Sequence, residues 1–218
     1  MTRLAVALAV LLVAGGTAWA QTPSPAPASR EQALTDLSRE DVEARRRAAA
    51  ALGEVGRMED VPALVQALRD RDGIVRALAE NSLWGVWSHS GDPEVDALFE
   101  LGVEQMNLRQ GPSAVDIFTR IVEKKPEFAE GWNKRATVYF LMGEYDKSLR
   151  DCDEVMKRNP SHFGALAGYG QIYLRLGRPE RALPYFERAL AVNPNMDGVA
   201  QMIEEIKALL AEKRRESV

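Results

Sequence analysis

Apolar residues recur at spacings of three and four along most of the chain, which is the period of an amphipathic helix. The stretch 60–70 carries one such stripe, formed by Val61, Leu64, Val65 and Leu68. Asp60 is the expected N-cap of this helix, and Pro62 lies in its first turn, where the missing N–H costs little. The pattern predicts an all-α protein.

A first internal repeat, with a period of 31 residues, covers the N-terminal part of the chain. Its matched pairs are Arg45 with Arg76, Leu52 with Leu83, and Val55 with Val86. The pattern predicts helices joined by turns, with an arginine near the start of the first helix of each unit. It resembles the short HEAT-like repeats of phycobilisome-lyase relatives over residues 36–91. The resemblance implies a fold only, because many scaffolds share these repeats and no lyase site can be matched.

A second repeat, with a period of 34 residues, follows the first. Four sets of residues recur at this spacing: Pro126, Pro160 and Pro194; Gly102, Ala136 and Gly170; Ala114, Ser148 and Ala182; Leu98, Trp132 and Leu166. This arrangement is similar to the tetratricopeptide repeat (TPR), a helical hairpin of 34 residues. We therefore expect three repeats within 92–196, at 95–128, 129–162 and 163–196. The small residue of the second set should let the two helices of each hairpin approach closely.

The ends of the TPR array also carry signals. Asp92–Pro93 is expected to open its first helix directly after Gly91, so the two arrays should join without a linker. Arg109 replaces the usual turn glycine of the first repeat, and we expect that turn to form around Gly111–Pro112. An apolar helical stripe continues beyond the last repeat, so residues 197–218 are predicted to be a capping helix and tail. The expected architecture is an α-solenoid of stacked helical hairpins.

The N-terminus resembles a signal peptide. Arg3 precedes an apolar run over 4–13, and small residues stand at 18 and 20, where signal peptidase reads the chain. Residues 1–20 are therefore predicted to be a leader for the general secretory route, and 21–35 a spacer rich in Pro, Ala and Ser. The predicted location is the periplasm, without membrane insertion after cleavage. An inner-membrane anchor formed by an uncleaved leader is the alternative.

Composition offers little for catalysis. The formal net charge is −4, so no nucleic-acid partner is expected. The one cysteine, Cys152, aligns with Phe118 and Phe186 in the neighbouring repeats and is expected in the core. The segment Ser88-His89-Ser90 with Asp92 contains the residue types of a hydrolytic triad, but adjacency does not make one, and helix termination is the favoured interpretation. No catalytic residue, cofactor or metal site is predicted.

The TPR resemblance implies a partner-binding groove lined by the first helix of each repeat. Carried over residue by residue, the groove consists of Phe99, Val103, Met106, Asn133, Thr137, Phe140, Leu141, Ala167, Gln171, Leu174 and Arg175. This apolar lining suits an extended apolar segment or one face of an amphipathic helix. Family members that grip a C-terminal carboxylate use Lys, Asn and Arg at places that here hold Phe99, Val103, Gly164 and Gly168. Only Lys134 is basic, so such a clamp is not expected.

These patterns predict a non-catalytic protein-interaction scaffold or adaptor in the bacterial envelope, with a protein or peptide as its partner. Two alternatives remain. One is a regulatory or assembly subunit of an envelope enzyme, which would use the HEAT-like end for contact. The other, a hydrolase, would require His89 and Asp92 to act in catalysis.

Overall fold

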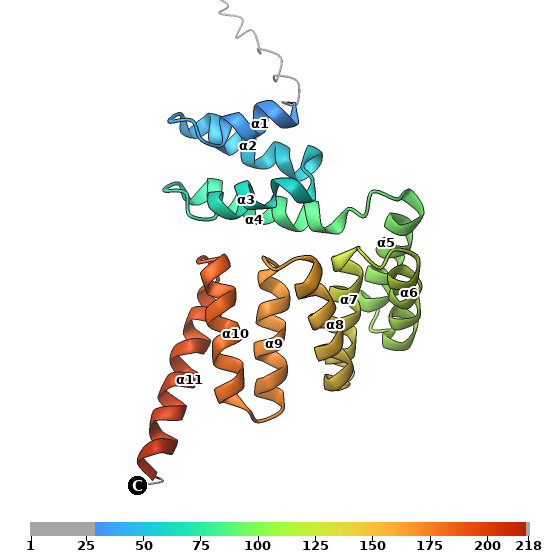
Figure 1. Cartoon of the computed structure of the whole chain (residues 1–218), viewed down its shortest axis with the longest axis vertical. Coiled ribbons are helices and arrows are strands. Elements are labelled where there is room, and N and C mark those ends of the chain that lie inside the picture. The colour runs from blue at the N-terminus through green and yellow to red at the C-terminus, as the bar shows by residue number, and fades with distance from the viewer. Residues whose placement is uncertain (1–28, 217–218) are drawn as a thin grey trace, which may run out of the picture.

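Helices make up most of the chain that the structure describes, residues 29–216 (Figure 1). In this computed structural model the elements are α1 (Arg30–Asp36), α2 (Val42–Val55), the 3-10 helix η1 (Met58–Asp60), α3 (Val61–Ala67), α4 (Gly73–Ser88), α5 (Pro93–Asn107), α6 (Gly111–Lys124), α7 (Ala129–Leu141), α8 (Tyr145–Arg158), α9 (Phe163–Arg175), α10 (Pro179–Val192) and α11 (Asp197–Glu216). Consecutive helices pack as hairpins, so the predicted all-α fold is confirmed. The predicted leader, 1–20, lies outside the described residues.

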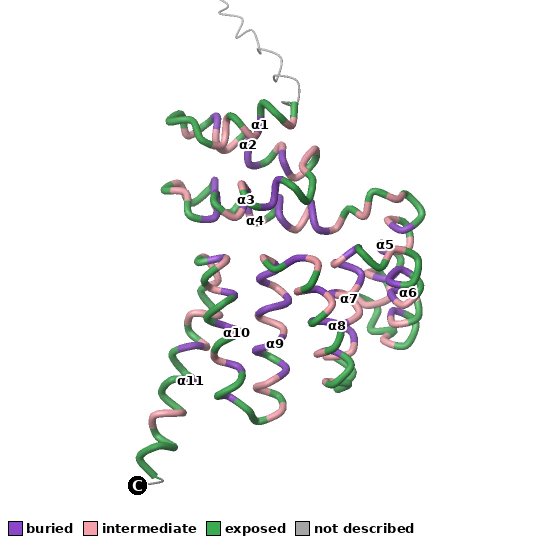
Figure 2. Tube along the Cα trace, in the orientation of Figure 1, coloured by how far each residue is buried: buried purple, intermediate pink, exposed green. Residues whose placement is uncertain are grey.

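The helices are arranged in two stacks. The N-terminal stack consists of α1–α4 with η1, and the C-terminal stack of α5–α11; in Figure 1 the first stack lies across the upper ends of α9 and α10. Buried residues lie where neighbouring helices meet, while the turns are largely exposed (Figure 2). The last helix, α11, packs on the last hairpin through the buried Ile203 and Ile206, which share a core with Phe186.

Aspartates start three of the helices. Asp41, Asp72 and Asp92 each accept hydrogen bonds from two backbone N–H groups in the first turns of α2, α4 and α5. These bonds satisfy donors that have no partner within the helix. Asp60 was predicted to cap α3 in this way, but its side chain makes no capping bond there. Its carboxylate instead accepts two bonds of 2.7 Å from the guanidinium of Arg30.

Helix α1 lies largely within 21–35, the stretch expected to be a spacer. Ser29 caps this helix, and Ala33 is fully buried in the core of the N-terminal stack. The ion pair between Arg30 and Asp60 ties α1 to η1. A helix of 7 residues is too short to show a clear apolar period, and for this reason the sequence pattern did not mark it.

The turns inside the three C-terminal hairpins each place one residue in the left-handed region. Gly143 and Gly177 have φ values of 80° and 68°, which glycine adopts without steric cost. The equivalent residue of the first hairpin is Arg109, with φ of 59°. The predicted turn around Gly111–Pro112 is therefore wrong, because α6 already begins at Gly111 and Arg109 makes the bend. Such a conformation costs a non-glycine residue about 1–3 kcal/mol.

Small residues allow close packing within the hairpins. A Cβ atom added to Gly102 would lie 2.8 Å from the ring of Phe118, and one added to Gly170 would lie 2.6 Å from the ring of Phe186. Both rings are buried in the core and have little room to move. The expectation that small residues let the two helices of a hairpin approach closely is confirmed at these two places.

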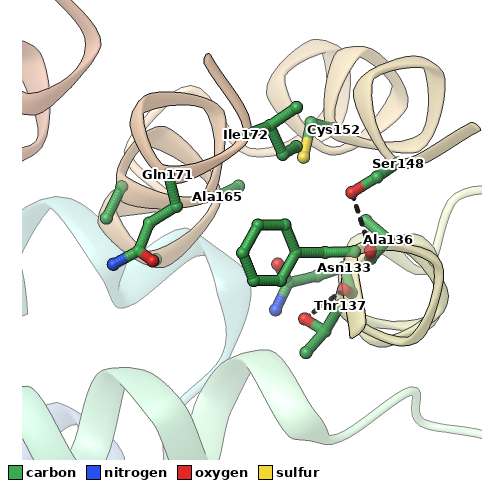
Figure 3. Close-up of a pocket in the computed structure, with 12 residues that line it drawn as sticks. Asn133, Ala136, Thr137, Ser148, Cys152, Ala165, Gln171 and Ile172 are labelled. Carbon is green, nitrogen blue, oxygen red and sulfur yellow. Dashed lines mark hydrogen bonds between the residues drawn. The ribbon is translucent and has the colours of Figure 1, made fainter. Parts of the chain in front are cut away.

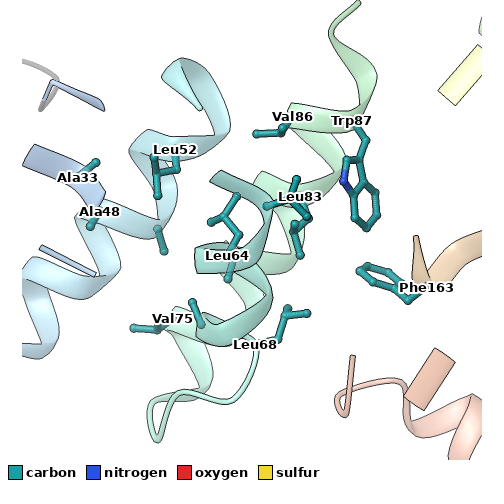
Figure 4. Packing of buried hydrophobic residues seen from close by; sticks show 14 residues of the cluster. Ala33, Ala48, Leu52, Leu64, Leu68, Val75, Leu83, Val86, Trp87 and Phe163 are labelled. Carbon is teal, nitrogen blue, oxygen red and sulfur yellow. The ribbon is translucent and has the colours of Figure 1, made fainter. Parts of the chain in front are cut away.

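Aromatic residues join the two stacks. Trp87 of α4 is stacked on His162, with ring centroids 4.4 Å apart. Its ring also lies 5.1 Å from that of Phe163, which faces it in Figure 4. Trp84, one turn earlier, meets Phe163 edge to face at 5.2 Å. Phe163 thus starts α9 but belongs to the hydrophobic core of the N-terminal stack.

Polar contacts extend this junction to the far side of the N-terminal stack. The Arg69 guanidinium donates to the carbonyl oxygen of Val192 at 3.2 Å, near the C-terminal end of α10. Asn195 Nδ2 donates to the carbonyl oxygen of Leu68 at 2.8 Å. Because the core and these bonds cross between the stacks, we expect α1–α4 and α5–α11 to unfold together.

Candidate functional site

A pocket of about 240 Å³ opens between α7 and α9 (Figure 3). Three helices line it: α7 with Asn133, Ala136, Thr137 and Phe140, α8 with Ser148 and Cys152, and α9 with Gly164, Ala165, Ala167, Gly168, Gln171 and Ile172. The hydroxyl groups of Ser148 and Thr137 donate to backbone carbonyl oxygens at 2.7 and 2.9 Å and are satisfied. Within residues 29–216, the exposed Gln171 side chain makes no hydrogen bond and is available to a ligand. The pocket is a largely apolar hollow with a free amide at its rim.

Some of the predicted groove residues meet at this pocket, and others do not. Those that line it are Asn133, Thr137, Phe140, Ala167 and Gln171. Those of the first repeat pack in the core beside α6: Phe99, Val103 and Met106. Leu174 packs against the core shared by α10 and α11, while Leu141 is 68% exposed at the end of α7. Arg175 lies with its guanidinium 6.0 Å from the ring of Phe140.

Two glycines shape the pocket and were considered from the sequence only as missing clamp positions. A Cβ added to Gly168 would meet only Cys152 Sγ, at the ordinary distance of 3.9 Å, so the lack of a side chain leaves this space open. A Cβ added to Gly164 would lie 2.5 Å from Trp84, because the indole of α4 covers this glycine. Trp84 therefore packs directly against a glycine that lines the pocket. Glycines four residues apart lie on one face of a helix, and this spacing is the signal that could have located the pocket.

A buried carboxylate, that of Glu130, lies near this contact. Glu130 is fully buried, and its oxygens receive Lys134 Nζ at 3.0 Å and Asn133 Nδ2 at 3.1 and 3.2 Å. His162 Nε2 lies 2.8 Å from the same carboxylate. Because His162 Nδ1 accepts the N–H of Ala165 at 3.1 Å, geometry assigns the ring proton to Nε2, which donates to Glu130. Lys134, the one basic residue at a clamp position, is thus paired within the chain.

The charge state of Glu130 follows from these contacts. Burial raises the pKa of the carboxyl group, but the hydrogen bond from His162 and the nearby Lys134 outweigh it, and the net pKa is lowered. Glu130 is therefore ionised at neutral pH. Its carboxylate already binds Lys134 and Asn133, which could otherwise bind the carboxylate of a partner.

Cys152 lies in the core, as predicted, with 3% of its surface exposed. Burial, together with the neighbouring carboxylates of Asp151 and Asp153, raises the pKa of its thiol to about 12. The thiolate is the reactive form of cysteine, so this thiol is a poor nucleophile at neutral pH.

The residues that resembled a hydrolytic triad shape the connection between the stacks. His89 Nδ1 donates to the carbonyl oxygen of Gly85 at 2.8 Å, and Ser90 Oγ donates to that of Asp92 at 3.1 Å. The Asp92 carboxylate caps α5. In the part of the chain that the structure covers, no cluster of His, Cys, Asp or Glu side chains has the makings of a metal site. Nor does any helix between 29 and 216 combine the length and apolarity that crossing a bilayer requires.

Similarity to known proteins supports the 34-residue repeats. A family model described as tetratricopeptide repeat matches residues 127–195. A TPR repeat-containing protein of Rhizobium etli is 34% identical over 148 residues, which cover 68% of this chain and 71% of that protein. Hsp70-Hsp90 organizing protein 1 of Glycine max is 23% identical over 120 residues, but these cover only 21% of its length.

Solved structures agree on the fold. The Sgt2 TPR domain from Aspergillus fumigatus has a TM-score of 0.54 at 21% identity, covering 57% of this chain and 83% of the domain. The first TPR of Spaghetti (RPAP3), bound to the HSP90 peptide SRMEEVD, has a TM-score of 0.52 at 24% identity. The match covers 54% of this chain and 93% of that domain. None of these matches supports the HEAT-like resemblance of residues 36–91, and TPR proteins are typically non-catalytic. The chain belongs to the tetratricopeptide repeat family.

Proposed function

We propose that this chain is a non-catalytic adaptor that holds an apolar segment of a partner protein in the pocket between α7 and α9. The observation that carries the proposal is the apolar hollow of about 240 Å³ at the first helices of two successive repeats. A TPR domain of similar fold is bound to a peptide, which shows that this architecture can receive one. One leucine-sized side chain buried in the hollow would contribute about 1.5–3 kcal/mol.

The contacts around the pocket favour an internal segment over a C-terminal tail. Lys134 and Asn133 already bind the carboxylate of Glu130, so a partner carboxylate would compete with a buried charge. Trp84 covers Gly164 at the same end. The free side chain of Gln171 can bond to a peptide backbone passing over the rim. The expected guest therefore offers an apolar side chain and a neutral backbone.

Filling the pocket should weaken binding without loss of folding. Peptides selected by display on the wild-type chain provide the probe, and fluorescence anisotropy provides their affinities. The substitution Gly168→Leu places a side chain in the hollow, where a Cβ meets only Cys152 Sγ at 3.9 Å. We expect the affinity to fall on the order of tenfold or more, as the guest side chain loses its burial. Amidating the C-terminus of the peptide should leave the affinity unchanged.

Gly73→Leu is the matched control for this experiment. It adds the same side chain at the exposed start of α4, outside the pocket, where a Cβ would come no closer than 3.5 Å to the guanidinium of Arg76. Equal peptide affinities of the Gly168→Leu and Gly73→Leu variants, with helical circular dichroism intact in both, would reject this pocket as the binding site. A strong preference for the free carboxylate would reject the neutral guest.

We also propose that the chain is exported to the periplasm. Arg3, the apolar run over 4–13 and the small residue Ala20 support this location. The chain recovered from periplasmic extracts should begin at Gln21 when its N-terminal peptide is measured by mass spectrometry. Recovery only from the inner membrane, with residues 1–20 still attached, would favour the anchored alternative.

A HEAT-like N-terminal segment over 36–91 remains part of the proposal, supported by its 31-residue repeat. The alternative function, an assembly subunit of an envelope enzyme, would need an exposed contact surface on the N-terminal stack, for which its tryptophans Trp84 and Trp87 are candidates. The structure places Trp87 in the junction with 3% of its surface exposed, so it offers no contact of that kind. We therefore assign the N-terminal stack the role of holding α4 against the TPR pocket.

A further inference from the structure

A second pocket lies at the junction of the two stacks, with different lining residues from those of the pocket between α7 and α9. It has a volume of about 140 Å³ and lies between the end of α4, the loop from α6 to α7 and the end of α8. Its lining includes Trp87, Lys125, Phe128, Arg158 and Asn159. We call it the junction pocket. Most of its polar side chains are hydrogen-bond donors.

Two buried donors in this lining lack a partner. Trp87 and Asn159 are each 3% exposed, and across residues 29–216 neither Trp87 Nε1 nor Asn159 Nδ2 finds an acceptor. The other end of the Asn159 amide is used, because its Oδ1 accepts the N–H of Ser161 at 3.2 Å. Buried donors in folded proteins are nearly always bonded, to protein atoms or to a bound molecule. Asn193 Nδ2, one repeat later and outside this pocket, is unpartnered in the same way, so the Trp87 indole is the donor that singles out the junction pocket as a site for an acceptor ligand.

The electrostatic surroundings favour a negative charge on that ligand. Helix α7 begins at the junction pocket, and its N-cap Phe128 supplies no side-chain acceptor for the first-turn N–H groups. A helix N-terminus attracts anions through these groups and through its dipole. The ammonium of Lys125 lies 3.9 Å from Glu127, which is longer than a hydrogen bond. Arg158 is more firmly held, by Glu154 at 2.6 Å.

Apolar side chains limit the size and shape of the anion. Met58 and Phe128 line the pocket together with the indole of Trp87. Glu127 also lines it and would repel a multiply charged group. A small, singly charged head on a short apolar stem fits this combination of donors and apolar walls.

We propose that the junction pocket binds a short-chain monocarboxylate. Its oxygen atoms accept hydrogen bonds from Trp87 Nε1 and Asn159 Nδ2, Lys125 supplies the counter-charge, and Phe128 contacts the aliphatic stem. The ligand bridges α4 and the TPR hairpins, so its binding holds the two stacks together. This site is independent of the adaptor function proposed for the pocket between α7 and α9.

Butyrate serves as the probe, titrated into the full chain labelled with nitrogen-15. The readout is the indole N–H resonance of Trp87, which is identified by its loss in the Trp87→Phe variant. We expect a saturable shift with butyrate and none with butyramide, which has the same shape without the charge. Lys125→Met should weaken butyrate binding on the order of tenfold, by loss of one charged partner. Lys124→Met is the matched control, because Lys124 pairs with Glu94 and does not line the pocket.

Several results would overturn the proposal. A Trp87 resonance that stays unmoved at high butyrate, or that moves equally with butyramide, would mean that these donors are bonded to water only. Equal affinity in the Lys125→Met and Lys124→Met variants would remove the role of the charge. An equally strong response to inorganic phosphate would replace the monocarboxylate by an unselective anion site.

Discussion

Replacing Phe163 with alanine should lower the free energy of unfolding by about 3–5 kcal/mol, the range for deleting a buried phenylalanine. Its side chain is 1% exposed, and its ring lies 5.2 Å from that of Trp84 and 5.1 Å from that of Trp87. Because Phe163 starts α9 but packs in the N-terminal core, the loss should destabilise both stacks together. Urea denaturation followed by circular dichroism measures it, and a single transition is expected in both proteins.

Leu141→Ala is the control for this loss. Leu141 is 68% exposed in the same stack, and its truncation should change the unfolding free energy by no more than about 0.5 kcal/mol. Two separate transitions, of which Phe163→Ala shifts only one, would show that the stacks fold independently.

Glu130→Ala is expected to cost a similar amount, about 3–5 kcal/mol, because it removes one partner of a buried ionic cluster. The change leaves the Nε2–H of His162 and the amide of Asn133 without their acceptor in a fully buried site. Thermal or urea unfolding at neutral pH measures the loss. Glu127→Ala is the control, because the side chain of Glu127 is 71% exposed in the preceding loop and should matter little. Equal losses in the two variants would contradict the structural role of Glu130.

Lowering the pH should reduce the stability that the Glu130 cluster provides. The pKa of Glu130 is lowered in the folded protein, so its carboxylate contributes stability above the unfolded value of about 4.5. That contribution is lost as the pH falls through the lowered pKa of the folded state. The wild-type unfolding free energy should therefore fall more steeply below about pH 4.5 than that of a Glu130→Gln variant. Parallel curves would mean that Glu130 does not titrate differently in the two states.

The helices and their hairpin pairing could be predicted because they depend on residues that are close together in the sequence. The 34-residue spacing of small residues anticipates the contacts of Gly102 with Phe118 and of Gly170 with Phe186. The cap at Asp92 could also be predicted, because a capping side chain accepts hydrogen bonds from N–H groups of the next few residues. The turn at Arg109 could not be predicted, because residues other than glycine rarely adopt the left-handed backbone conformation.

The site was harder to predict because it depends on contacts between distant segments. Repeat spacing describes how neighbours stack, but it carries no information on α4 lying back against α9. The covering of Gly164 by Trp84 and the stacking of Trp87 on His162 were therefore missed. Glu130 was missed as well, because its sequence neighbours give no sign that a carboxylate there is buried among donors.

Because α4 lies across one edge of the TPR hairpins, the two edges of the array differ. That edge carries the loops between repeats, where His162 and Val192 meet the N-terminal stack. The opposite edge carries the tight turns at Gly143 and Gly177, which point away from the junction (Figure 1). The turns at Gly143 and Gly177 are therefore not covered by the N-terminal stack. Loop grafts placed there should be tolerated, because they leave the packed junction between the two stacks untouched.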